Sequence, residues 1–201
     1  MNKKIIIIFS SGKEANSFIY QSDLKFEKIN RNEYQHNNII VCITGIGKKA
    51  VERINLNRFK DIAFVIKTGA CAVLDKNVPL CKTFVPLIVR YKTNDFKVDF
   101  SKLPEKVHKL ISVLTTNKTL LTQDEALFDE KKASDLFGSG ISFVDMETYF
   151  IIETFRNVPV IPLVVGTDRG GRNAKKDFLK MLPVASSVLK DELVKLTKFI
   201  Y

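Results

Sequence analysis

Acidic side chains follow two apolar runs in the second half of the chain. Asp145 and Glu147 come directly after Ile141 to Val144, and Asp168 comes shortly after Val158 to Val165. Runs of this length that are rich in β-branched residues predict buried strands. Because ligands of open α/β sheets bind at the carboxyl ends of the strands, these acids are candidates for chemistry.

Another acid lies near the start of the chain. Residues Lys4 to Phe9 are apolar beyond the first lysine and predict a central parallel strand, which ends at Ser10-Ser11-Gly12. A helix is predicted from about Lys13, so Glu14 falls in its first turn, at the mouth of the strand end. Taken alone, Glu14 is explained as a first-turn acid that complements the helix dipole.

Small residues follow two further predicted strands. Asn38 to Thr44 runs into Gly45-Ile46-Gly47, where backbone amides can approach an anion. No third glycine and no lysine–serine pair follows, which disfavours a dinucleotide or nucleoside triphosphate site. Ile62 to Lys67 leads into Thr68-Gly69-Ala70-Cys71-Ala72-Val73, where a ligand can lie close to the backbone. No histidine motif accompanies Cys71, so we interpret it as a small buried thiol.

The remaining segments complete an alternating strand and helix pattern in one domain, residues 1–201. Met146 to Arg156 predicts a short helix that returns the chain to start a parallel neighbouring strand. The loop Gln123 to Phe128 is placed to cover a ligand. The other predicted segments are a polar turn region at Asn30 to Asn38, an apolar stretch at Pro79 to Val89, an amphipathic helix at Pro104 to Leu114 and a short strand at Leu120 to Thr122. A terminal helix is predicted from about Ala174 to Phe199, with a break or kink at Pro183. We expect this helix to pack on the sheet and to take no part in the chemistry.

Composition excludes several classes of protein. The apolar and charged fractions, 45% and 27%, are ordinary for a soluble protein, and no apolar run approaches the length of a membrane span. The net charge of +10 comes from scattered lysines without a nucleic-acid-binding motif. Three cysteines without metal-ligand spacing indicate reduced thiols in a cytoplasmic protein. His36 and His108 lie away from the strand ends, which disfavours a Ser-His-Asp triad or a histidine metal site.

Five segments, taken in order, resemble the purine nucleoside phosphorylase and nucleosidase superfamily, and most closely the 5′-methylthioadenosine/S-adenosylhomocysteine nucleosidases. They are the opening strand with Glu14, Thr44-Gly45-Ile46-Gly47-Lys48, Lys67-Thr68-Gly69-Ala70-Cys71-Ala72, Val144-Asp145-Met146-Glu147 and Val165-Gly166-Thr167-Asp168. The resemblance covers almost the whole chain. It implies a three-layer α/β/α domain around a mixed, mostly parallel central sheet.

The resemblance also implies roles for individual residues. Asp168 matches the general acid that protonates N7 of the purine, and Glu14 matches the residue that orients the attacking water. Glu147 matches the glutamate that holds the ribose hydroxyls, with Met146 against the sugar. Asp145, Ala70 and Gly45 fall in the matching segments and are assigned to substrate binding with them, and Phe128 is the candidate for the aromatic residue that stacks on adenine.

Departures from the family pattern leave alternatives open. Ala70 and Val73 stand where the nucleosidases have serine and glycine. The arginine that many relatives carry just before the Ser-Asp pair, which matches Thr167-Asp168, is absent. These departures leave open a relative that binds nucleosides without catalysis. Lys67 resembles the arginine that binds phosphate in hexameric nucleoside phosphorylases, which allows phosphorolysis with phosphate as co-substrate. The loop Arg169-Gly170-Gly171-Arg172-Asn173 is similar in character to that of futalosine hydrolase.

The favoured hypothesis is hydrolysis of the N-glycosidic bond of a purine nucleoside such as 5′-methylthioadenosine or S-adenosylhomocysteine. No cofactor or metal is expected. The expected partner is the small-molecule nucleoside rather than nucleic acid or membrane, and the resemblance implies a homo-oligomer.

Overall fold

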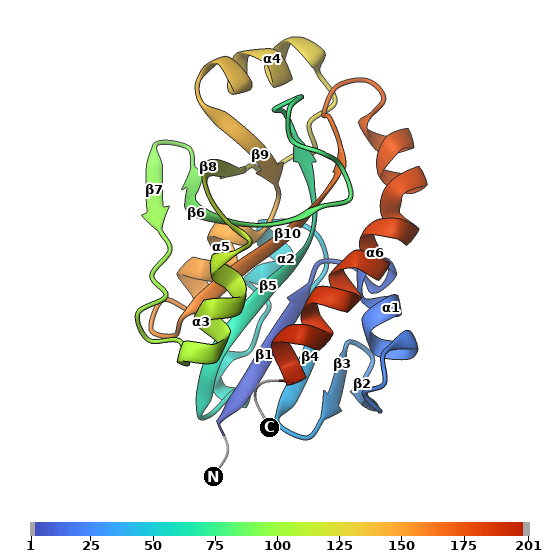
Figure 1. Ribbon diagram of the computed structural model, residues 1–201, viewed down its shortest axis with the longest axis vertical. Helices are drawn as coiled ribbons and strands as arrows, with labels where there is room; N and C mark the ends of the chain where they lie inside the picture. The colour runs from blue at the N-terminus through green and yellow to red at the C-terminus, as the bar shows by residue number, and fades with distance from the viewer. Residues whose placement is uncertain (1–2, 199–201) are drawn as a thin grey trace.

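A ten-stranded mixed sheet runs through the centre of the computed structural model, which describes residues 3–198 (Figure 1). Its strands, in chain order, are β1 (Lys4–Phe9), β2 (Glu27–Asn30), β3 (Glu33–His36), β4 (Ile39–Ile43), β5 (Ile62–Val73), β6 (Thr83–Tyr91), β7 (Asn94–Lys97), β8 (Thr115–Thr122), β9 (Ile141–Asp145) and β10 (Val160–Asp168). The helices are α1 (Gly12–Gln21), α2 (Lys48–Val51), α3 (Glu105–Ser112), α4 (Glu130–Gly138), α5 (Thr148–Thr154) and α6 (Ala174–Lys198), with a 3₁₀ turn at Leu56–Arg58.

Helices cover both faces of the sheet, which confirms the predicted three layers. Successive side chains of a strand point to opposite faces. Ile5, Ile7 and Phe9 of β1 therefore pack in one apolar cluster with α1, α3 and α6. Ile6 and Ile8 pack in a second cluster with α2 and α5. The helix α4 packs separately against β9 through a third, smaller cluster.

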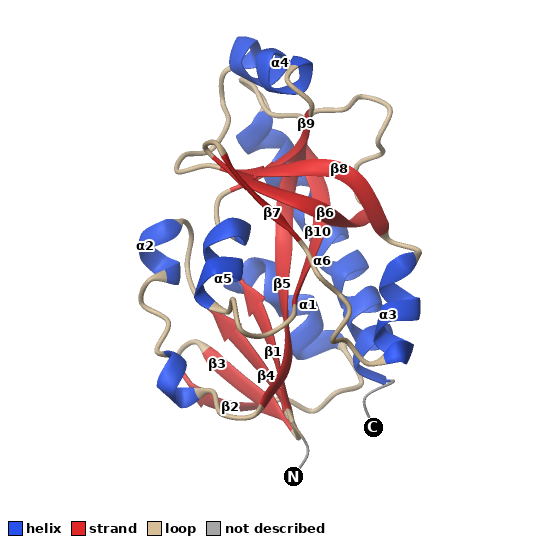
Figure 2. Cartoon of the chain, turned by 90° about the vertical axis from the view of Figure 1, so that its left-hand side faces the viewer, coloured by secondary structure: helices blue, strands red, loops and turns tan. Residues whose placement is uncertain are grey.

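Two long strands, β5 and β10, organise the sheet. They pair with each other in parallel, and each also has an antiparallel partner, β9 for β5 and β6 for β10. The parallel pairs β6–β8 and β8–β9 close these five strands into a ring, while β1, β4, β3 and β2 extend the sheet from β5. Figure 2 shows β6, β8 and β9 curled beside the upper parts of β5 and β10. Five of the ten pairings are parallel.

The pairing registers leave a gap along one edge of β5. Strand β1 pairs with this edge as far as Phe9 opposite Thr68, and β9 pairs with it from Ala72 opposite Val144. The other edge is paired with β10 up to Asp168, which also lies opposite Ala72. Asp168 and the end of β9 therefore lie on opposite edges of β5 at Ala72. The preceding segment 69–71 has no strand partner on the edge that pairs with β1 and β9.

Several predicted elements differ from the structure. β5 continues through the small residues 68–73 instead of ending at Lys67. β9 and β10 are not hydrogen-bonded neighbours, because β5 lies between them, so the predicted parallel pairing was wrong. The polar segment 30–38 contains β3, which carries His36, and β8 begins at Thr115, well before Leu120. α6 does not break at Pro183; its predicted end at Phe199 lies outside the described residues.

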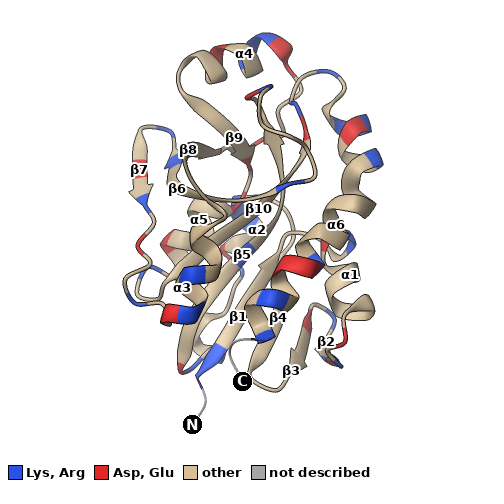
Figure 3. Ribbon diagram, in the orientation of Figure 1, with Lys and Arg blue, Asp and Glu red and all other residues tan. Residues whose placement is uncertain are grey.

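Basic residues are dispersed over the surface. In the view of Figure 3, both basic and acidic residues occur along α3, α4 and α6. Within residues 3–198, no helix is both long and apolar enough to cross a bilayer.

Candidate active site

A cavity of about 230 Å³ opens at the gap between the ends of β1 and β9. Seven of the nine residues predicted to form the site line it: Asp168, Glu14, Glu147, Met146, Asp145, Phe128 and Ala70. The two exceptions are Lys67 and Gly45. Residues 69–71 have no strand partner on this edge, so the cavity reaches the backbone of β5 directly.

Asp168 ends β10 at one end of the cavity and is held by uncharged donors. Its Oδ1 accepts a hydrogen bond from the backbone amide of Gly170 at 2.9 Å, and its Oδ2 accepts one from the hydroxyl of Thr167 at 3.0 Å. Burial raises the pKa of the Asp168 carboxyl, and the two hydrogen bonds offset part of this effect. The surroundings of Asp168 thus favour a bound proton, and no cation within residues 3–198 opposes this effect.

Thr167 is suited to either protonation state of Asp168. Its hydroxyl also lies 3.3 Å from the carbonyl oxygen of Cys71. When Asp168 is ionised, Thr167 donates to it. When Asp168 is protonated, Thr167 accepts the proton of the carboxyl and donates its own to Cys71, because a hydroxyl carries one donor and two acceptor sites.

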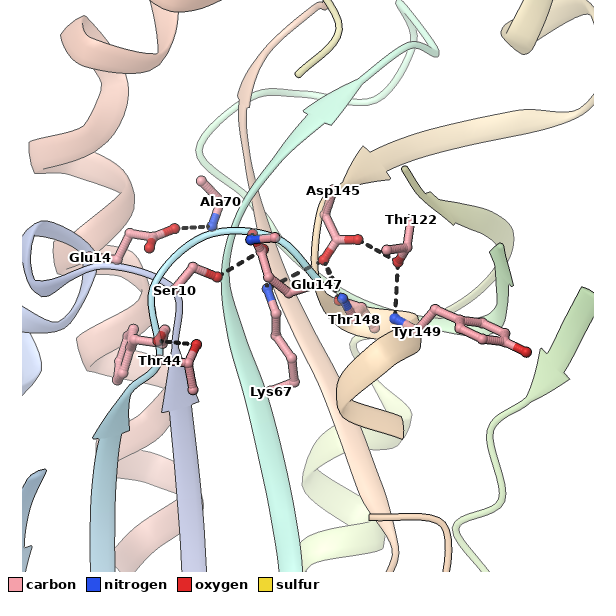
Figure 4. A network of polar contacts seen from close by, with 12 residues as sticks. Ser10, Glu14, Thr44, Lys67, Ala70, Thr122, Asp145, Glu147, Thr148 and Tyr149 are labelled. Carbon is pink, nitrogen blue, oxygen red and sulfur yellow. Dashed lines mark hydrogen bonds and ion pairs between the residues drawn. The ribbon is translucent and has the colours of Figure 1, made fainter. Parts of the chain in front are cut away.

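Glu147 lies immediately after β9, and a buried network fixes its carboxylate (Figure 4). Oε2 accepts from the hydroxyl of Ser10 at 2.8 Å, and Oε1 accepts from the backbone amide of Gly47 at 2.7 Å. Gly47 begins α2 with φ of +82°, a conformation that favours glycine and turns its amide toward Glu147. Burial raises the pKa of Glu147, and the cation of Lys67 acts in the opposite direction.

Glu14 reaches the cavity from the first turn of α1. Its Oε1 accepts from the backbone amide of Ala70 at 2.8 Å, and its Oε2 accepts from the hydroxyl of Ser11 at 2.8 Å. The amide of Ala70 is available because β1 has already ended. A side chain at Gly69 would place its Cβ 2.8 Å from Oε1 of Glu14, so only glycine leaves room for this carboxylate.

Lys67 lies beneath the cavity and does not line it. The side chain is 1% exposed, with its Nζ 3.3 Å from Oδ2 of Asp145 and 3.7 Å from Oε2 of Glu147. The carboxylate of Asp145 also accepts hydrogen bonds from within the protein. Its Oδ1 accepts one from the hydroxyl of Thr122 at 2.7 Å, and its Oδ2 accepts one from the backbone amide of Thr148 at 3.0 Å and one from the Thr148 hydroxyl. Asp145 therefore supports the chain that carries Glu147.

Gly45 supports the site without facing it. Its φ of +96° forms the turn that precedes Gly47, and an added Cβ would lie 3.1 Å from that of Ala50. Its neighbour Ile46, Ser10 and Thr167 also line the cavity and were not among the predicted site residues. Gln123 lines it too, within the loop that was predicted to cover a ligand. The start of α6, assigned to packing alone, contributes Lys175 and Phe178 to the lining. Apolar residues at helical spacing look like core, so no sequence signal marked Phe178.

Neither histidine reaches the cavity, and no group of three or more potential metal ligands occurs among residues 3–198. Cys71 lines the cavity, but burial raises the pKa of its thiol well above the ordinary value, which disfavours a nucleophilic thiolate. The arrangement instead offers one acid able to hold a proton and a group of anchored carboxylates. Such a site can protonate a leaving group at one end and stabilise positive charge at the other.

Solved structures similar to this chain were found by comparison of folds. The 5′-methylthioadenosine/S-adenosylhomocysteine nucleosidase of Neisseria meningitidis, in complex with methylthio-immucillin-A, superposes with a TM-score of 0.81 at 15% identity over 98% of this chain and 99% of that one. Futalosine hydrolase of Helicobacter pylori gives 0.81 at 17% identity over 98% of both chains. The nucleosidase CT263 of Chlamydia trachomatis gives 0.75 at 19% identity over the full length of both chains.

By sequence, no protein-family profile and no curated protein matches the chain. The three structural likenesses span essentially the whole chain, so they concern the complete set of strands that frames the cavity. This chain thus has the α/β fold of the 5′-methylthioadenosine/S-adenosylhomocysteine nucleosidases and futalosine hydrolase.

Proposed function

We propose that this chain is a nucleosidase that hydrolyses the N-glycosidic bond of a purine nucleoside, with 5′-methylthioadenosine and S-adenosylhomocysteine as the first candidates. One observation carries the proposal: Asp168, Glu147 and Glu14, the three acids to which the resemblance gives separate roles, line a single cavity in the nucleosidase fold. Each is held differently. The proposed reaction uses water and no cofactor.

At the base end, Asp168 supplies the proton. As the bond between C1′ and N9 breaks, its electron pair passes to the purine, and the carboxyl of Asp168 donates its proton to N7. Protonation stabilises an otherwise poor leaving group. The raised pKa of Asp168 supports this role, because the carboxyl must be protonated before the reaction begins.

At the sugar end, Glu147 and Glu14 act on the ribose and the water. Glu147 accepts hydrogen bonds from the ribose hydroxyls, and its charge favours the positive charge that develops on the sugar ring. Glu14 orients the water that adds to C1′ and accepts a proton from it. The net reaction converts a nucleoside and water into the free base and the free sugar.

The departures at two positions of β5 are compatible with activity. Ala70 lacks the serine hydroxyl of the nucleosidases, but its backbone amide still holds Glu14 at 2.8 Å. Val73 is buried and does not line the cavity. These observations favour a working enzyme over a relative that binds nucleosides without turnover.

The position of Lys67 favours water over phosphate as the nucleophile. Its ammonium group is buried beneath the cavity and lies within 4 Å of two carboxylates, Asp145 and Glu147. A phosphate ion would have to displace these partners and approach several anchored acids at once. Phosphorolysis through Lys67 therefore has weaker support than hydrolysis.

Futalosine is a second candidate substrate. Futalosine hydrolase matches this fold with the same TM-score as a 5′-methylthioadenosine/S-adenosylhomocysteine nucleosidase, 0.81. The cavity of this chain also carries one lysine, Lys175, at the exposed start of α6. A substrate with an acidic tail could meet this cation.

Incubation with single nucleosides tests the proposal. The purified protein is given 5′-methylthioadenosine, S-adenosylhomocysteine, futalosine, adenosine or inosine, with and without phosphate, and the products are separated by chromatography. We expect free base and unphosphorylated sugar in phosphate-free buffer. Base release that depends on phosphate, with a sugar 1-phosphate as product, would replace hydrolysis by phosphorolysis. Binding of a nucleoside without any base release would indicate a non-catalytic protein.

A further inference from the structure

One buried cation lies among the acids of the sugar end. Lys67 projects from β5, and its Nζ is 3.3 Å from Asp145 and 3.7 Å from Glu147 (Figure 4). Glu14 is close on a third side, because a Cβ built on Gly69 would lie 2.8 Å from Oε1 of Glu14 and 3.5 Å from this Nζ. Lys67 is thus shared by acids that come from α1, from β9 and from the residues that follow β9.

The contacts of Lys67 are electrostatic. Within residues 3–198, its Nζ has no hydrogen bond of good geometry, although the side chain is fully buried. Burial would lower the pKa of Lys67, but Asp145, Glu147 and Glu14 outweigh burial and raise it, so the side chain is charged at neutral pH. The charges of the three acids affect the pKa of Lys67 more than its contact with Asp145 as a hydrogen-bond donor does, so Lys67 acts on its neighbours chiefly through its charge.

The charge balance indicates what Lys67 does. Lys67 contributes one positive charge to a buried group that contains the carboxyl groups of Glu14, Asp145 and Glu147. Without it, three carboxylates would share a buried region, and close buried carboxylates do not all remain ionised. Glu147 is the member of this group whose pKa is already raised by burial, so it would take up the proton.

We propose that Lys67 is a positioning residue whose ammonium group keeps Glu147 ionised, so that this carboxylate can accept hydrogen bonds from the ribose and face the positive charge of the sugar with its own negative charge. This inference rests on the proposed nucleosidase function for its catalytic consequence. The charge effect itself concerns the free protein and is measurable without any substrate.

The other charged groups near Glu147 do not replace Lys67. Lys48 on α2 is half exposed, lies 3.8 Å from Glu52 and has its Nζ over the ring of Phe150. Asp168 on β10 is an acid and adds negative charge. Asp145 raises the pKa of Glu147, as expected for a neighbouring carboxylate. Lys67 is the buried cation among the charged residues that the structure places around Glu147.

The direct test is a titration of Glu147 in the free protein. The protein is labelled with ¹³C at its glutamate carboxyl groups, and the Glu147 signal is assigned by its loss in Glu147→Gln. In Lys67→Met, a substitution of similar length without charge, we expect the pKa of Glu147 to rise by about one to three pH units. An unchanged Glu147 titration in a folded Lys67→Met protein would overturn the proposal.

Two further variants separate charge from packing. Lys118→Met removes the same charge from an ion pair with Asp75, which does not line the cavity, and should leave the Glu147 titration unchanged. Lys67→Met combined with Asp145→Asn removes one charge of each sign and should return the Glu147 titration toward that of the wild type. If the double variant titrates like Lys67→Met alone, lost packing is the cause and the charge role is refuted.

Activity then shows the catalytic consequence. In Lys67→Met, the acid limb of kcat/KM should move to higher pH by the same amount as the titration, while the alkaline limb, which reflects loss of the Asp168 proton, should stay in place. Loss of activity by the same factor at every pH would overturn the catalytic part. If the wild type cleaves no nucleoside while the Glu147 titration still shifts in Lys67→Met, the nucleosidase proposal fails and the charge role of Lys67 stands.

Discussion

The two ends of the cavity contain the same kind of side chain in opposite surroundings. At the base end, Asp168 meets uncharged donors from Gly170 and Thr167 and no cation within ion-pair distance among the described residues. At the sugar end, Glu14, Asp145 and Glu147 share the buried cation of Lys67 and accept hydrogen bonds from fixed donors. A nearby cation favours the ionised form of a carboxyl group, so Lys67 offsets part of the burial that raises the pKa of Glu147, whereas no described cation offsets the burial that raises the pKa of Asp168.

In the proposed reaction, this difference divides the chemistry of glycosidic bond cleavage between the two ends. The leaving base requires a proton, and the sugar requires nearby negative charge. Acids with different tasks in one site are set apart by their environments rather than by their residue type. The position of Lys67 is consistent with this proposal, because a cation beside Asp168 would favour the ionised form of the proposed proton donor.

Replacement of the proton donor should break the base end and have the largest effect. Asp168→Asn keeps the size of the side chain and can still accept a hydrogen bond from Gly170, but it cannot transfer a proton. We expect kcat/KM to fall about 10²- to 10⁴-fold. Asp191→Asn is the matched control, because Asp191 is exposed on α6 and does not line the cavity. Near-normal turnover by Asp168→Asn in the nucleoside assay would remove Asp168 from the mechanism.

Neutralising one acid of the sugar end should have the next largest effect. Glu147→Gln can keep the hydrogen bond from Gly47, but it loses the negative charge that faces the sugar. We expect kcat/KM to fall about 10²-fold, as for removal of one fixed electrostatic contact to a transition state. Steady-state kinetics of Glu147→Gln and of Glu153→Gln, an exposed position on α5, provide the comparison. Equal activity of the two variants would contradict the assigned role of Glu147.

The sequence predicted the acids of both ends but not their partners. Glu14, Glu147 and Asp168 were recognised because each follows a predicted strand and falls in a segment that resembles the nucleosidases. The environment of Lys67 was not predictable, because Asp145 and Glu147 are about 80 residues away in the chain and meet it only through the pairing of β5 with β9. A lysine after an apolar run is otherwise expected at the surface.

Strand pairing limited the prediction of the fold in the same way. The apolar runs located β1, β4, β9 and β10 to within a few residues, since burial of both faces leaves a clear pattern. Their order did not follow from the sequence. The insertion of β5 between β9 and β10, and the gap that this leaves at 69–71, depend on contacts between distant segments.

A smaller effect on stability would sharpen the comparison between the two ends. The pKa of Asp168 is raised in the folded protein above its value in the unfolded chain, about 3.9. The folded state therefore binds the proton more tightly, and stability falls as the pH rises from the unfolded pKa through the folded pKa. Asp168→Asn cannot ionise, so it should melt at a higher temperature than the wild type at pH 7, each kcal/mol corresponding to about 2–4 °C. The gain should vanish below about pH 4, where both side chains are neutral. Melting curves at pH 4 and pH 7 that show no such difference would place Asp168 in a more solvated environment than the one described for the base end.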